Sequence, residues 1–353
     1  MQHPRHQGFL KYVAYLQAIG IILVVFGHSF HEYPDGDYGR TLTVYRMMYS
    51  FRMPLFLFVS GFLMVFTMRL RGASRRSWGA FAMEKCVRLM IPLVFLSAVA
   101  YLPRVLMSHM ADEPVELGLK PFAASFFDSS SLTIPYFWFL HVSFLLLLLT
   151  YGVVLVADRF KASRVAALAL LAVAIAAMWL LPVEWPTVFS VNEAVRLGVY
   201  FVAGALFGEL SEQVDRYVPW HSWRLFAVLA LAWAGLFFVT EDTPWIMVCS
   251  FFGIAMCVSF VKNLEYYNVG VLDHLIGANY MIFLLSWFCN VATQQVLHHF
   301  VELPWWVFTI LSLAGGVYLP WLAYRLLSRY SSRQWARCAA FLLGQRVGKR
   351  PKG

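Results

Sequence analysis

The chain has 353 residues, of which 60% are hydrophobic and only 13% are charged, and its formal net charge is +9. Soluble globular domains average roughly 45–50% apolar and about 25% charged residues, so this composition excludes an ordinary soluble domain. A charge of +9 on a soluble protein would favour nucleic-acid binding. Here the basic residues gather in alternate loops, which indicates the positive-inside rule of membrane proteins and no nucleic-acid partner. The five cysteines are odd in number and lack metal-ligand spacing, so they predict neither a disulfide framework nor a metal site.

A membrane-spanning helix needs about 20 largely apolar residues. Ten segments meet this requirement, so we predict an all-α fold: a polytopic membrane protein with about ten transmembrane helices. The predicted spans are residues 13–30, 46–67, 88–107, 136–157, 163–181, 194–210, 223–240, 244–262, 277–297 and 304–327.

The basic residues predict the orientation of these spans. Lys and Arg cluster around residues 5–11, 69–88, 159–164 and 325–352, while acidic residues dominate the alternating loops. Because cytoplasmic loops carry the excess of Lys and Arg, we expect both termini in the cytoplasm.

One membrane domain is expected over residues 1–330, followed by a basic cytoplasmic tail over residues 331–353. The tail fits a membrane-surface helix better than a catalytic element. The predicted outer loop from about 108 to 135 is the longest and could cover a site at that face.

His28 is the most informative residue, because it ends an apolar run that contains no charge after Lys11. Ionisable side chains in or beside a membrane span are costly and usually mark function, and histidine titrates near neutral pH. Gln17 lies eleven residues earlier, which returns to nearly the same helix face roughly 16 Å away. The alternative for His28 is an interfacial histidine that is solvated by lipid headgroups. For Gln17 a hydrogen bond between helices is the favoured interpretation.

Other polar side chains in or beside the spans are candidates for binding. Arg52 lies within the second span, where a charge costs about 2.5–3.5 kcal/mol at the centre, so it should face a wet cavity or a partner unless it snorkels outward. His141 lies in the fourth span, where a neutral histidine bonded to another helix is favoured over acceptor binding. Glu193 and Arg196 begin the sixth span and predict an ion pair, with acceptor binding as the second reading. Polar residues of the ninth span, including Asn290 and Gln294, predict interhelical hydrogen bonds.

Several segments in order resemble the acyltransferase-3 family of integral-membrane acyltransferases. The matching segments are Gln17–Ser29, Phe51–Phe62, Lys85–Pro92, Trp138–Leu140 and Gly204–Gly208, with a weaker match over Gly277–Ser286. The resemblance implies transfer of an acyl group, often acetyl from acyl-coenzyme A, to sugars of surface polysaccharides or related acceptors. The family pattern has an Arg eleven residues before the His, and Gln17 stands there in this chain, which puts the electrostatic role of that Arg in doubt.

The resemblance assigns roles to these residues. His28 would be the general base, Arg52 or Gln17 would stabilise the oxyanion, and Lys85 and Arg88 would bind the phosphates of the donor, acyl-coenzyme A; positive-inside topology is the alternative for that basic pair. The expected location is the bacterial plasma membrane, and the expected partners are a glycan or lipid-linked sugar acceptor and membrane lipid. The competing functions are an exporter or flippase of a glycan, and a non-catalytic partner in polysaccharide assembly.

Overall fold

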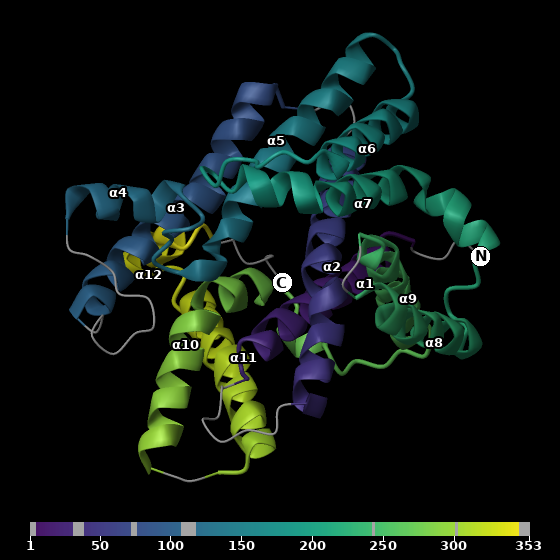
Figure 1. Ribbon diagram of the computed structural model, residues 1–353. Helices are drawn as coiled ribbons and strands as arrows, with labels where there is room; N and C mark the ends of the chain where they lie inside the picture. Colours follow the sequence, from purple (N-terminus) through teal and green to yellow (C-terminus); the bar gives the residue numbers. More distant parts are fainter. Residues whose placement is uncertain are drawn as a thin grey trace. The chain divides into compact units, whose positions relative to one another are not determined.

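The computed structural model describes residues 5–30, 39–71, 76–106, 118–241, 244–300 and 303–345 (Figure 1). Within these residues the regular structure is helical, apart from one isolated β-bridge between Asp128 and Val188. The described α-helices are α1 Arg5–Gly27, α2 Gly39–Arg71, α3 Trp78–Leu106, α4 Leu119–Phe127, α5 Trp138–Arg159, α6 Arg164–Leu180, α7 Val191–Tyr217, α8 Trp223–Thr240, α9 Ile246–Tyr266, α10 Asn279–Phe300, α11 Trp305–Arg329 and α12 Gln334–Leu342. Short 3-10 helices are present at Pro135–Phe137 and Asp273–Leu275.

The predicted polytopic membrane fold is confirmed. Eight of the described helices are long and apolar enough to cross a membrane, and the shorter apolar helices Lys11–Gly27 and Arg164–Leu180 bring the set to the ten predicted positions. Two further helices were not among the predicted spans. α4 lies in the predicted outer loop, of which residues 108–117 are outside the described part of the chain, and α12 lies in the predicted tail, whose residues 346–353 are also outside it.

Local sequence explains where some helices begin. Ser163 precedes α6 and accepts a hydrogen bond from the backbone N–H of Ala166, and Ser222 precedes α8 and accepts one from Leu225. Each serine therefore satisfies one of the backbone donors that a helix leaves unpaired at its first turn.

The helices form two compact units. The first contains residues 1–63 and 210–326, and the second contains residues 64–209 and 327–353. All candidate residues on α1 and the first half of α2 belong to the first unit, and those on α3, α5 and α7 belong to the second.

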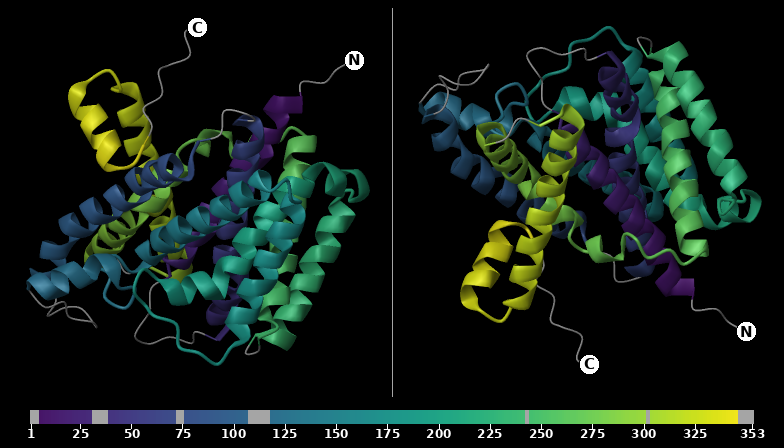
Figure 2. Two further views of the ribbon diagram at one scale, coloured as in Figure 1. Left: turned by 90° about the horizontal axis from the view of Figure 1, so that it is seen from above. Right: turned by 90° about the horizontal axis from the view of Figure 1, so that it is seen from below.

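The first unit is built on α1, which packs against α9 and α10. α8 and α9 lie side by side as a helical hairpin (Figure 2). Gly253 of α9 allows a close approach to Phe51, since a Cβ at Gly253 would lie 2.6 Å from the Phe51 ring. The first unit thereby packs its helices around α1 and places the end of that helix among α2, α10 and α11 side chains.

The second unit packs α3 against α5 and α4, α5 against α6, and α12 against α3. Phe81 of α3 stacks on Tyr151 of α5 with ring centroids 3.8 Å apart, and the Tyr151 hydroxyl donates to the Arg76 carbonyl at 2.8 Å. These contacts fix the start of α3, where the predicted basic pair lies. The five cysteines are free thiols in the structure.

Candidate active site

His28 lies immediately after the last residue of α1. Its N–H donates to the Val25 carbonyl at 3.0 Å, and the Ser29 hydroxyl donates to the same carbonyl at 2.8 Å. The first bond spans three residues and tightens the last turn of the helix, and both bonds satisfy a carbonyl that the helix leaves unpaired. His28 as a whole residue is half-buried.

Arg52 of α2 lies against the backbone of Gly27, the residue before His28. A Cβ at Gly27 would be 1.3 Å from the Arg52 Nη1, so only glycine leaves room for the guanidinium here. The guanidinium carbon is also 4.4 Å from the ring centre of Tyr49 and 5.4 Å from that of Tyr45. Cation–π contacts of this kind stabilise a desolvated guanidinium by about 2 kcal/mol or more.

The burial of Arg52 distinguishes it from a snorkelling arginine. Arg52 is only 4% exposed, and its Nε is a buried donor with no hydrogen-bond partner among the described residues. Outward snorkelling is therefore wrong for this side chain. A buried unpaired donor costs free energy and needs an explanation, such as a ligand atom that it awaits.

Gln17 lies half-buried on α1. Because helical rise places it roughly 16 Å from His28 along the axis, it is Arg52 that the structure brings to the end of α1. A cation from another helix thus reaches the backbone beside His28, although the position eleven residues earlier carries no charge.

The predicted basic pair, Lys85 and Arg88, lies one turn apart on α3, and both side chains are half-buried. The Lys85 ammonium lies 5.0 Å from the ring centre of Phe81. Gly344, just after α12, has φ of +60° and packs against the Arg88 carbonyl, since a Cβ there would lie 2.3 Å from that oxygen. The end of α12 therefore lies on the turn of α3 that carries the pair.

His141 is fully buried in α5 and joins two other segments. Its Nε2 is 2.9 Å from the Phe126 carbonyl, and its Nδ1 is 3.2 Å from the Ser190 hydroxyl. Since a carbonyl only accepts, Nε2 carries the proton and Nδ1 accepts from Ser190. Ser190 has φ of 54°, uncommon for a residue with a side chain, so this bond supports a strained turn. The predicted bond from His141 to another helix is present, since Phe126 belongs to α4.

Glu193 and Arg196 form the predicted ion pair at the start of α7, with 3.1 Å between the Arg196 Nη2 and the Glu193 Oε2. The Arg196 side chain is 51% exposed. Exposed pairs of this kind contribute about 0–1 kcal/mol. Acceptor binding by His141, Glu193 and Arg196 stays a prediction.

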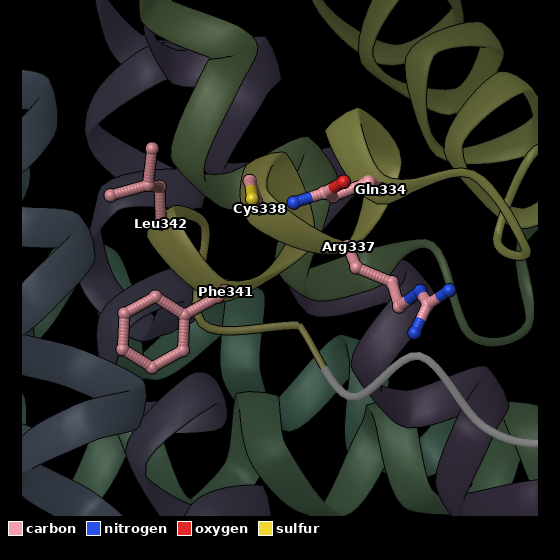
Figure 3. Close-up of a pocket in the computed structure, with 5 residues that line it drawn as sticks. All are labelled: Gln334, Arg337, Cys338, Phe341 and Leu342. Carbon is pink, nitrogen blue, oxygen red and sulfur yellow. The ribbon is translucent and has the colours of Figure 1, made fainter.

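The cavities of the second unit include one on α12 and one along α5 and α6. One, of about 620 Å³, is lined by Gln334, Arg337, Cys338, Phe341 and Leu342 of α12, and Figure 3 shows Arg337 and Phe341 pointing away from each other. The other, of about 690 Å³, lies along α5 and α6 and is mainly apolar. Within the described residues no group of three His, Cys, Asp or Glu side chains could hold a metal ion.

Comparison with known families identifies the chain. The family model described as acyltransferase domain, the acyltransferase-3 family, matches residues 10–325. The chain belongs to this family. No curated protein and no solved structure matched it.

Membership confirms the predicted resemblance and makes the chain a membrane acyltransferase. The matched range includes every candidate residue of this acyltransferase from Gln17 to Arg196, and it ends before α12. α10 also lies within it, so the hydrogen bonds that this helix makes to other helices belong to the family domain.

Sequence reasoning missed two contributors to the site, Tyr49 and Tyr45, and the partner of a third, Gln294. Tyr49 and Tyr45 are three and seven residues before Arg52, a helical spacing that puts all three on one face and could have indicated the cation–π contacts. Gln294 of α10 donates to the His28 carbonyl at 3.2 Å and to the Ser312 hydroxyl at 3.0 Å. An interhelical bond was predicted for this acyltransferase's Gln294 and is confirmed, but its partner, 266 residues away, had no sequence signal.

Proposed function

We propose that this membrane acyltransferase moves an acyl group, acetyl in the simplest case, from acyl-coenzyme A to a hydroxyl of a surface polysaccharide or lipid-linked sugar in a bacterial plasma membrane. His28 acts as the general base. The observation that supports this best is the buried Arg52 guanidinium, with an unpaired Nε, lying against the residue next to His28. A proton acceptor beside a preorganised cation is the pairing that acyl transfer needs.

The reaction is a single displacement at the thioester carbonyl. The acceptor oxygen attacks the carbonyl carbon while the His28 imidazole takes the hydroxyl proton. The C–O bond forms, the C–S bond breaks, and the departing thiolate takes the proton from the imidazolium. A base in this position is typically worth about 10²–10⁴ in rate.

Arg52 stabilises the negative charge that develops on the carbonyl oxygen. Donors fixed before the reaction are most effective where water is excluded, and Arg52 is 4% exposed and held on two tyrosine faces. Gln17 is an uncharged hydrogen-bond donor deeper on α1. It therefore suits a contact with the acyl group of acyl-coenzyme A rather than stabilisation of a charge.

Donor binding belongs to α3 in this proposal. Lys85 and Arg88 offer charge-assisted hydrogen bonds to the phosphates of coenzyme A from the cytoplasmic side. Glu193 and Arg196 belong to the acceptor side, where the half-exposed Arg196 is the group that a sugar hydroxyl can reach. The fully buried His141 supports this side indirectly, by its bond to Ser190 just before α7.

Labelled acetyl-coenzyme A tests the proposal. Purified protein in lipid nanodiscs should release free coenzyme A and move label to acetate or to added glycan, and His28→Ala should lose this activity while keeping its thermal stability. His299→Ala is the matched control, because His299 is an exposed histidine in the last turn of α10. Near-normal turnover by His28→Ala would show that the mechanism is wrong.

Gln17 is the one observation that favours a second function, a non-catalytic partner in polysaccharide assembly. The uncharged side chain stands where the family pattern has Arg. In that case the wild-type protein would turn over no acetyl-coenzyme A, and Gln17→Arg would be the variant in which to look for restored activity.

A further inference from the structure

The backbone of His28 has an unusual hydrogen-bond partner. A helix leaves its last four carbonyls without intrahelical donors, and the carbonyl of His28 follows the last residue of α1. A side chain from a distant helix satisfies it: the Gln294 Nε2 of α10 is 3.2 Å from this oxygen.

The orientation of the Gln294 amide follows from chemistry. A carbonyl oxygen only accepts, so the amide nitrogen must face His28, and the nitrogen's second N–H is directed to the Ser312 hydroxyl at 3.0 Å. Ser312 of α11 is fully buried. Both donors of the amide are therefore used, one on α1 and one on α11.

Close packing fixes the helices that carry these groups. Gly316 of α11 has no room for a side chain, because a Cβ there would lie 2.2 Å from the Asn290 Oδ1 and 2.6 Å from the Val25 Cγ1. Val25 is the residue whose carbonyl accepts from the His28 N–H. The end of α1 therefore packs against α10 and, at Val25, against Gly316 of α11.

We propose that Gln294, held by Ser312, is a positioning residue for His28, an inference that rests on the proposed role of His28 as base. Gln294 holds the His28 carbonyl, while Arg52 occupies the space at Gly27. The two contacts come from different helices and fix consecutive residues. The imidazole then needs little rearrangement to meet the acceptor hydroxyl.

Gln294→Leu tests this proposal, because leucine keeps most of the volume and removes both donors. A misplacement of about 1 Å can lower a rate by about 100-fold, so we expect kcat to fall by up to that factor while the KM for acetyl-coenzyme A stays unchanged. Ser312→Ala should give a smaller loss of kcat, and Ser312→Thr, which keeps the hydroxyl, should retain activity. Gln295→Leu, one residue along α10 and exposed, is the matched control and should behave as wild type.

A double-mutant cycle separates positioning from simple stability. With His28→Ala in place, Gln294→Leu should cause no further loss, because the side chain that it positions is gone. An equal loss in both backgrounds, or a rise in KM without a fall in kcat, would overturn the positioning role. A fully active His28→Ala would instead refute the proposed function, and an inactive His28→Ala beside a fully active Gln294→Leu would refute only this inference.

Discussion

Gly27→Ala changes the distance between Arg52 and the proposed base without removing either residue. The new Cβ would be 1.3 Å from the Arg52 Nη1, whereas ordinary carbon contacts need about 3.5 Å. The guanidinium must therefore move by about 2 Å, and the faces of Tyr45 and Tyr49 limit where it can go.

The expected result separates activity from stability. Removing one oxyanion donor costs about 10²–10³ in kcat, and a 2 Å displacement should approach that loss. The fold should tolerate the change, because Gly27 does not have a left-handed backbone and alanine favours a helix over glycine by roughly 0.5–1 kcal/mol. The long Arg52 side chain can also swing aside.

The assay is coenzyme A release from acetyl-coenzyme A, with a thermal melt of each variant. Gly235→Ala is the control, since Gly235 lies in a helix of the same unit with nothing within 4 Å of the new Cβ, and it should keep full activity. In an Arg52→Leu background, Gly27→Ala should have little further effect. If Gly27→Ala retains the wild-type kcat and a melting curve that shows a folded protein, Arg52 does not stabilise the oxyanion.

Two further predictions concern the second unit. The double variant Lys85→Gln, Arg88→Gln should raise the KM for acetyl-coenzyme A several-fold and leave kcat nearly unchanged. Initial rates across a range of acetyl-coenzyme A concentrations measure both constants. An unchanged KM would indicate that the pair serves only the positive-inside topology. His141→Leu should lower thermal stability, because it leaves the Ser190 hydroxyl and the Phe126 carbonyl without their hydrogen-bond partner. Each buried unpaired group costs about 1–3 kcal/mol of folding free energy. A melting temperature unchanged from wild type would contradict the structural role of His141.

The sequence predicted the membrane fold well for a physical reason. Hydrocarbon thickness demands long apolar runs, and these are visible residue by residue, so all ten span positions match helices. α4 was not predicted, because its nine residues carry no span-length signal, whereas α12 lies in the tail for which a surface helix was expected without bounds.

The candidate site was predictable only in part. His28 and Arg52 stood out because an ionisable group in an apolar run is conspicuous. Which groups meet them depends on packing between distant helices. Gln294 reaches the His28 carbonyl, and Ser312 reaches Gln294, through contacts that no local pattern encodes. The room for Arg52 depends on Gly27, which looks in sequence like any glycine that allows close packing.

The central claim is that the His28 imidazole removes the proton of the acceptor. Its most direct test is turnover of acetyl-coenzyme A by His28→Ala, with and without imidazole in solution. The account predicts a fall of about 10²–10⁴-fold and partial recovery when imidazole is added. Turnover near the wild-type rate by the folded variant, without imidazole, would contradict it.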